Sequence, residues 1–166
     1  FEISDDDWQS FFDANVMSGG RISRRYTPGM VERKWGRVIF IASESAIQIP
    51  VEMVHYGTTK TAQLAVSRGR AATVAGTGVT VNTVMPGPTW SEGVEVFVQG
   101  MVSGPDKDFE AIEKEFFETA RPGSLINRFA TPEEIANLVT YIASPLSSAT
   151  TGAALRADGG VANFIL

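Results

Sequence analysis

The chain has 166 residues, 43% of them hydrophobic and 20% charged, which is the balance of a globular domain that can bury a core. Its 14 Lys and Arg residues against 19 Asp and Glu residues give a formal net charge of -5, which argues against nucleic acid or an anionic membrane as a partner. The absence of cysteine excludes disulfides and thiolate chemistry, and with a single histidine, His55, no metal site is expected.

A long helix is expected at the beginning of the chain, over about 5–33. Ser4 is a candidate N-cap, and Asp7 can complete a capping box with it. Apolar residues then recur close to the helical period, and Asn15 falls on the same stripe. A carboxamide on an apolar face must find hydrogen-bond partners or it costs stability. We expect Pro28 to kink or break this helix.

Two strands are expected next, with a helix between them. Residues 37–42 form a continuous rather than an alternating apolar run, which is typical of a parallel strand covered on both faces. Residues 79–85 are a second strand candidate, and the segment of about 55–75 suits a helix. A strand, a long helix and a strand form a crossover unit, and such units build doubly wound parallel sheets.

The rest of the chain has less regular periodicity until a second clear helix start. Short helices are expected over about 91–101 and 106–120. Thr131 then provides an N-cap and Glu134 a capping box for an amphipathic helix. The segment 151–160 fits a short strand closed by a glycine turn. We find no repeat and no linker, so the chain is expected to form one domain.

Three side chains around the first strand suggest acid–base chemistry. Ser43 follows the strand end, where open parallel sheets bind ligands, and Tyr56 and Lys60 are four residues apart on one helix face. A nearby ammonium lowers the pKa of a phenol, and a serine hydroxyl can donate to an oxygen that gains negative charge. Ser45 competes with Ser43, but the thirteen-residue spacing to Tyr56 favours Ser43. The trio moves a proton and no hydride, so a redox cofactor is implied.

Several further segments occur around this trio in a familiar order and spacing. Together with the trio, the chain resembles the short-chain dehydrogenase/reductase family over essentially its whole length. The segments that carry the resemblance are Phe12-Asp13-Ala14-Asn15-Val16, Tyr56-Gly57-Thr58-Thr59-Lys60, Asn82-Thr83-Val84-Met85-Pro86-Gly87, Thr131-Pro132-Glu133-Glu134, Thr151-Gly152 and Asp158-Gly159-Gly160.

The resemblance implies a catalytic role for four residues. Tyr56 would be the general acid/base that exchanges a proton with the substrate oxygen. Lys60 would lower the pKa of Tyr56 and hold the nicotinamide ribose hydroxyls. Ser43 would orient and polarise the substrate carbonyl, and Asn15 would support a water-linked proton path near Lys60.

The resemblance also places cofactor and substrate contacts after the second strand. Pro86, Gly87 and either Thr89 or Ser91 would contact the nicotinamide end of NAD or NADP, and the sequence does not separate the two hydroxyls. The family's variable substrate loop would contain three large apolar residues, which either line a pocket or belong to the core: Trp90, Phe97 and Met101. His55 adjoins Tyr56 in the sequence and therefore does not share its helix face.

One part of the family pattern is absent. The glycine-rich strand-to-helix turn that holds the pyrophosphate is not found, because Gly76-Thr77-Gly78 precedes a strand instead of following one. We therefore expect residues 1–166 to be a single partial domain: the C-terminal half of a Rossmann-like, doubly wound α/β sheet, with about three strands plus helices. The fragment alone is expected to be inactive, and preference between NAD and NADP stays open.

The expected function is NAD(P)-dependent interconversion of an alcohol and a carbonyl on a small molecule, in a cytoplasmic homodimer or homotetramer formed through the helices of about 5–33 and 55–75. The alternative is a non-catalytic half-domain that acts only through its association surface. A serine hydrolase is disfavoured because Ser43 does not lie in a Gly-x-Ser-x-Gly turn.

Overall fold

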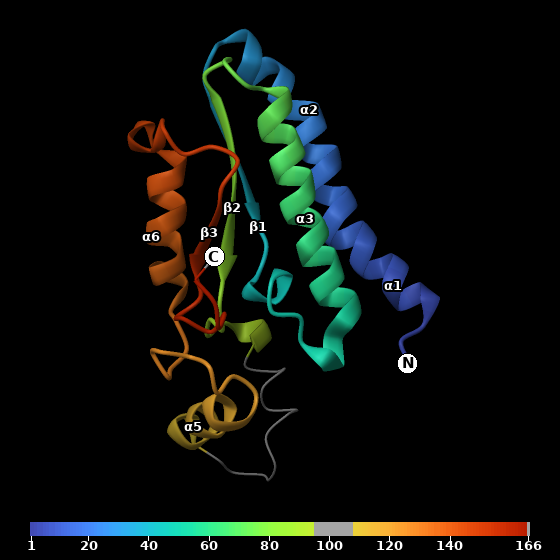
Figure 1. Cartoon of the computed structure of the whole chain (residues 1–166), viewed down its shortest axis with the longest axis vertical. Coiled ribbons are helices and arrows are strands. Elements are labelled where there is room, and N and C mark those ends of the chain that lie inside the picture. The colour runs from blue at the N-terminus through green and yellow to red at the C-terminus, as the bar shows by residue number, and fades with distance from the viewer. Residues whose placement is uncertain (95–107, 166) are drawn as a thin grey trace.

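A three-stranded parallel sheet forms the centre of the molecule (Figure 1). The computed structural model describes residues 1–94 and 108–165. Strand β1 (Gly36–Ile41) pairs with β2 (Val79–Pro86), and β2 pairs with β3 (Ala154–Ala157), all in parallel. The α/β class and the parallel strands expected from the apolar runs are therefore confirmed, and β2 is the buried central strand.

Helices cover both faces of this sheet (Figure 1). On one face lie α1 (Asp5–Phe12), a π-helical turn (Asp13–Met17) and α2 (Ser18–Glu32) as one continuous rod, beside α3 (Val54–Thr73). The opposite face is covered by α6 (Pro132–Ala143). Since β1 is followed by α3 and then by β2, the crossover unit expected from the sequence is present.

The core between the sheet and the rod of helices is built from β-branched and small residues. Small side chains on α3 let its backbone approach the sheet, while valine and phenylalanine of the strands fill the remaining space. The buried cluster consists of Phe40, Ala71, Val74, Val79 and Val81. It fixes α3 on the strands and thereby sets the position of the first turns of α3.

Of the kink or break expected at Pro28, the break is wrong. Helix α2 runs through Pro28 to Glu32, so the loss of one N–H does not end it. The irregularity lies instead at Asp13–Met17, where a π turn loosens the regular pattern of helical hydrogen bonds. There the main-chain carbonyl of Asn15 accepts a hydrogen bond of 2.6 Å from Nε2 of Gln63 on α3. This carbonyl therefore has a partner on a neighbouring helix, 48 residues away in the sequence, which local propensity does not predict.

The segments after β2 are shorter. Helix α5 (Phe109–Thr119) confirms the helix expected over 106–120, whereas most of the helix expected over 91–101 lies outside the described residues. The described chain also contains three single 3-10 turns: Glu44–Ala46, Val51–Met53 and Pro145–Ser147. Within this described part, no helix combines the length and the hydropathy needed to cross a membrane.

The beginning of α6 is fixed by the capping box that the sequence predicts. Thr131 Oγ1 accepts from the Glu134 main-chain N–H, and the Glu134 carboxylate accepts from the Thr131 N–H. Arg128 adds a two-pronged ion pair, with Nη1 and Nη2 at 2.9 and 2.7 Å from the Glu134 oxygens. Mainly because of this Arg128 hydrogen bond, the pKa of Glu134 falls to about 2.

Replacing Thr131 with alanine should destabilise the protein by about 1 kcal/mol, because the Glu134 N–H loses its side-chain acceptor. Urea denaturation followed by circular dichroism measures this change. Thr140→Ala on the exposed side of the same helix is the matched control and should stay within about 0.5 kcal/mol of the parent protein. Equal losses in the two variants would show that the cap contributes nothing specific.

Candidate active site

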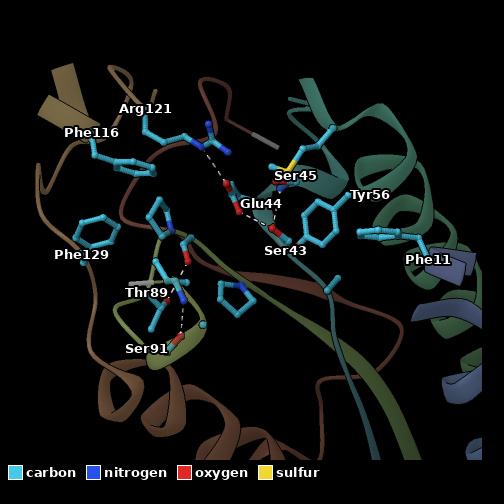
Figure 2. Close-up of a pocket in the computed structure, with 17 residues that line it drawn as sticks. Phe11, Ser43, Glu44, Ser45, Tyr56, Thr89, Ser91, Phe116, Arg121 and Phe129 are labelled. Carbon is cyan, nitrogen blue, oxygen red and sulfur yellow. Dashed lines mark hydrogen bonds and ion pairs between the residues drawn. The ribbon is translucent and has the colours of Figure 1, made fainter. Parts of the chain in front are cut away.

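A cavity of about 520 Å³ opens at the carboxyl ends of β1 and β2, with mostly apolar walls (Figure 2). Strand ends of open parallel sheets are the usual ligand sites of this fold class. The cavity brings together six of the predicted site residues, which are Ser43, Tyr56, Pro86, Gly87, Thr89 and Ser91. The other two, Lys60 and Asn15, do not line it.

Ser43 is positioned by the end of β1 and by the 3-10 turn that follows. Its extended backbone makes it the N-cap of the turn Glu44–Ala46, and its Oγ accepts from the Ser45 N–H at 3.1 Å. The Ser43 hydroxyl donates to Oε2 of Glu44 at 2.5 Å, and the serine is only 6% exposed. The competitor Ser45 contributes its main-chain N–H to this arrangement.

Tyr56 and Lys60 share one face of α3, as their spacing predicts. The Lys60 Nζ lies 5.6 Å from the centre of the Tyr56 ring. It donates to the main-chain oxygen of Ile41, the last residue of β1, at 3.2 Å. Both side chains therefore lie at the strand end that carries Ser43, with Lys60 outside the residues that line the cavity.

The ionisation of Tyr56 differs from the sequence-based expectation. We expected Lys60 to lower the pKa of the phenol, but that pKa is raised, because burial of the ring edge disfavours the charged phenolate. Hydrogen bonding with Ser43 lowers the pKa and Glu44 raises it, and both effects are smaller than that of burial. Burial also lowers the pKa of Lys60. The Tyr56 phenol is therefore protonated near neutral pH.

Asn15 joins the helical rod to the segment that carries Tyr56. Its Nδ2 donates to Oγ1 of Thr59 at 3.0 Å, and Thr59 donates in turn to the main-chain oxygen of Tyr56 at 2.8 Å. The expected partners of this carboxamide are thus present. Its role in a water-linked proton path stays a prediction.

The loop after β2 forms the opposite wall of the cavity. A Cβ atom on Gly87 would lie 2.5 Å from the main-chain oxygen of Asp158, so only glycine permits this close approach of two chain segments. Thr89 Oγ1 donates to the Gly87 oxygen at 3.0 Å, while Ser91 Oγ accepts from the Val94 N–H at 3.4 Å. Both hydroxyl residues line the cavity, and the choice between them stays open.

Two other candidates lie away from the cavity lining. Trp90 packs with its ring 4.6 Å from Phe109 and 5.1 Å from Phe129, so it belongs to the aromatic core around α5. The His55 ring contacts Phe11 of α1 edge-on at 4.3 Å and has a buried Nδ1 with no partner among the described residues. The remaining loop candidates, Phe97 and Met101, fall outside the described residues.

Sequence reasoning missed part of the cavity. The missed lining residues include a charged pair, Glu44 and Arg121, and three aromatic rings, Phe11, Phe116 and Phe129. Glu44 could have been noticed as an acid directly after Ser43. The others come from segments far away in the chain, which carry no local signal for a shared site.

The cavity fits one end of a nicotinamide dinucleotide. Hydroxyls of Ser43 and Tyr56 on one wall and of Thr89 and Ser91 on the other surround apolar surface that a flat ring can contact. The 166 residues contain no glycine-rich strand-to-helix turn of the kind that holds a pyrophosphate. Within the described part of the chain, no group of three metal-ligating side chains is found.

Comparison with known proteins places this arrangement in a family. A family model described as Enoyl-(Acyl carrier protein) reductase matches residues 1–162. The chain is 31% identical to Dehydrogenase/reductase SDR family member 4 of Caenorhabditis elegans over 160 residues, which are 96% of this chain and 58% of that protein. The chain belongs to the short-chain dehydrogenase/reductase family. The family resemblance predicted from the sequence is therefore confirmed.

Two further similarities support this family and its Rossmann-like fold. The oxidoreductase YvaG of Bacillus subtilis is 53% identical over 165 residues, which are 99% of this chain and 62% of that protein. The structure of L-sorbose reductase from Gluconobacter frateurii, complexed with NADPH and L-sorbose, superposes with a TM-score of 0.90 at 27% identity. It covers 99% of this chain and 61% of that one. The chain thus spans less than two thirds of the length of these short-chain dehydrogenase/reductases.

Proposed function

We propose that this chain is the catalytic half of an NAD(P)-dependent oxidoreductase that interconverts an alcohol and a carbonyl. The observation that carries the proposal is the convergence of the Ser43 and Tyr56 hydroxyls on one apolar cavity at the strand ends. The family membership supports the reaction class, and NADPH in the sorbose reductase complex supports the cofactor class. A nicotinamide held against Pro86, Gly87 and Thr89 or Ser91 would supply or accept the hydride.

The residues of the chain would move the proton. Tyr56 would donate its phenolic proton to the carbonyl oxygen in reduction and accept it in oxidation. Ser43 would donate a hydrogen bond to the same oxygen as negative charge develops there. Lys60 would hold ribose hydroxyls and keep positive charge near the phenol, and Asn15 would keep the helical rod attached beside Tyr56. Because burial raises the pKa of Tyr56, the phenol carries its proton at neutral pH. Carbonyl reduction needs this protonated form as the general acid.

Turnover by the complete gene product tests this proposal. A panel of ketones, aldehydes and their alcohols is assayed at neutral pH with each of the two nicotinamide cofactors, and absorbance at 340 nm reports the hydride transfer. We expect at least one carbonyl to be reduced with one cofactor. If the folded protein turns over no compound in the panel, the result contradicts the proposal and supports the alternative of a non-catalytic half-domain that acts through its association surface.

We further propose that a dinucleotide-binding half accompanies this chain in the functional protein. The similar proteins exceed the chain by more than a third of their length, and the chain has no glycine-rich turn of its own. Among the described residues β1 pairs only with β2, and Ile41 at its end is 45% exposed. The mass of the natural gene product tests the presence of this second half. We expect a mass that corresponds to a chain of about 250 residues.

The 166-residue chain alone should bind NAD(H) and NADP(H) more weakly than about 1 mM, because the pyrophosphate contributes no contact. Isothermal titration calorimetry of the isolated chain against the complete gene product measures the difference. Micromolar binding by the isolated chain would show that the glycine-rich turn is dispensable.

Association of copies is proposed through the rod of helices and α3. Large apolar side chains stand exposed there, among them Ile22 at 60% and Tyr26 at 64%. A homodimer or homotetramer in the cytoplasm would cover them. Sedimentation of the complete gene product decides between these states, and a monomer would contradict both.

A further inference from the structure

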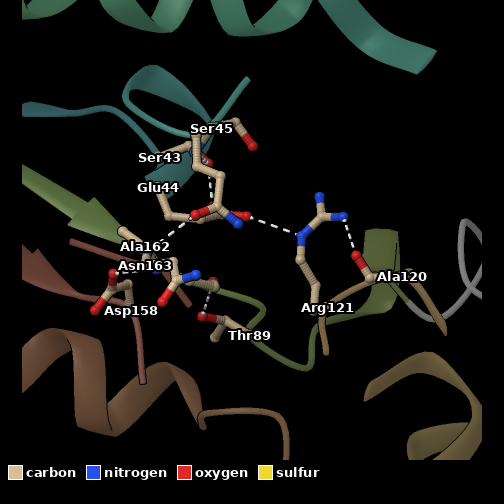
Figure 3. A network of polar contacts seen from close by, with 11 residues as sticks. Ser43, Glu44, Ser45, Thr89, Ala120, Arg121, Asp158, Ala162 and Asn163 are labelled. Carbon is tan, nitrogen blue, oxygen red and sulfur yellow. Dashed lines mark hydrogen bonds and ion pairs between the residues drawn. The ribbon is translucent and has the colours of Figure 1, made fainter. Parts of the chain in front are cut away.

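Glu44 is a buried carboxylate beside the candidate active site. The proposed proton transfer does not use it. It is 5% exposed. Its two oxygens have different partners: Oε2 accepts from the Ser43 hydroxyl at 2.5 Å, and Oε1 lies 3.3 Å from Nε of Arg121 (Figures 2 and 3). The carboxylate therefore bridges the proposed hydrogen-bond donor of the site and a cation.

Arg121 reaches this position from the segment after α5, 77 residues further along the chain. Its Nη1 donates to the main-chain oxygen of Ala120 at 2.8 Å, and its side chain is 14% exposed. The desolvation of two buried charges often exceeds their mutual attraction, and apolar residues of similar volume are frequently as stabilising. Stability alone is thus a weak reason for an ion pair at this place.

The pair also forms a boundary between two cavities. Glu44 and Arg121 line the active-site cavity and a neighbouring cavity of about 470 Å³, whose other walls include Gln48, Pro50 and Val161. The ion pair is thus part of the wall of the site, in direct contact with Ser43. The charges of Glu44 and Arg121 therefore act on the groups beside Ser43, among them the Tyr56 phenol.

The Ser43 hydroxyl has one proton to donate, and while Tyr56 is protonated Ser43 donates it to Glu44. A hydrogen bond to a carboxylate is roughly twice as strong as one to a neutral acceptor. A neutral carbonyl oxygen therefore competes poorly with Glu44 for the Ser43 proton. An oxygen that has gained negative charge competes on equal terms, so the donation is strongest when the charge develops. Binding of this kind stabilises the transition state more than the ground state.

We propose that Glu44 and Arg121 are positioning residues for Ser43: the carboxylate holds the Ser43 proton until charge develops on the substrate oxygen, and the guanidinium holds the carboxylate. This inference rests on the proposed function. It assigns a role in the reaction to a charged pair that the acid–base trio does not include.

The two partners act on Tyr56 with opposite signs, which gives the inference a test. Glu44 raises the pKa of Tyr56 and Arg121 lowers it. On its own helix Tyr56 is faced by Lys60 and adjoined by His55, and from α1 it meets the uncharged ring of Phe11 at 6.2 Å. Removing either member of the pair changes the charge at Tyr56 while these other groups stay in place.

The test uses the complete gene product and its alcohol substrate from the panel. In alcohol oxidation Tyr56 must accept a proton, so the rate rises as pH rises through the Tyr56 pKa. Glu44→Gln should move this rising limb to lower pH by roughly half a unit or more, and Arg121→Gln should move it to higher pH. The double variant should lie between them. In the carbonyl direction Glu44→Gln should lower KM and kcat together, because a neutral amide oxygen holds the Ser43 proton less strongly and the proton can then bind the ground-state carbonyl.

Glu118→Gln on the exposed face of α5 makes the same substitution away from the site and should leave the profile unchanged. If Arg121→Gln does not fold because it leaves a buried carboxylate unpaired, Glu44→Gln and the double variant, checked by thermal melting, decide the question. A folded Glu44→Gln variant with the parent pH limb and the parent KM overturns the inference while leaving the proposed function intact. Absence of turnover in the parent protein overturns both.

Discussion

Replacement of Tyr56 with phenylalanine is expected to lower kcat for carbonyl reduction by at least about 10³-fold. The substitution removes the phenolic proton and leaves the ring, which packs against Phe11. General acid catalysis contributes about 10²–10⁴-fold, and among the described residues that line the cavity Tyr56 is the one phenol. Steady-state kinetics with the best carbonyl of the panel measures the loss.

Cofactor affinity should change much less than kcat in this variant, by about threefold or less, because the ring and Lys60 stay in place. Fluorescence titration with the reduced cofactor measures this affinity. Tyr141→Phe on α6 is the matched control, since Tyr141 is 45% exposed and does not line the cavity. A Tyr56→Phe enzyme that keeps more than about a tenth of the parent kcat would refute proton transfer by this phenol.

The sequence predicted the sheet well because its strands carry strong local signals. Residues 37–42 form a continuous apolar run, which is typical of a strand covered on both faces, and residues 79–85 are rich in the β-branched residues valine and threonine. Thr131 and Glu134 likewise form a capping box from residues three positions apart. Such features depend on residues that are close in the sequence, so they can be predicted without knowledge of the tertiary structure.

The expectations that failed depend on distant partners. The π turn at Asn15 is accompanied by a hydrogen bond from Gln63, 48 residues away, and a proline that usually breaks a helix drew attention to the wrong turn. The raised pKa of Tyr56 follows from burial by segments that meet only in the folded chain. Trp90 lies in the core because α5 brings Phe109 against it.

The candidate site shows the same division. Ser43, Tyr56 and Lys60 are linked by one strand, one turn and one helix, so their spacing was enough to place them together. Arg121 enters the same site from a segment whose sequence gives no indication of it, and the partner it finds there is visible only in the fold. Local patterns therefore identified the residues to which we assign proton transfer, whereas the charged pair beside them is visible only in the tertiary structure.

Ser43→Ala is expected to lower kcat for carbonyl reduction by about 10²-fold, the loss typical of one hydrogen-bond donor to a developing oxyanion. The KM should change little, because the Ser43 proton is held by Glu44 when the carbonyl is neutral. Steady-state kinetics on the same carbonyl gives both constants.

Ser45→Ala is the informative comparison, since the sequence left Ser45 as the competing serine. That variant keeps the main-chain N–H that donates to Ser43 Oγ, so its loss in kcat should stay below about tenfold. Glu44 remains buried in both variants, but only Ser43→Ala leaves its Oε2 without the serine donor. A larger loss from Ser45→Ala than from Ser43→Ala would transfer the donor role to Ser45. It would also remove the reason for Glu44 to hold a proton beside the substrate, because the hydroxyl that Glu44 contacts would no longer be the one that stabilises the charge.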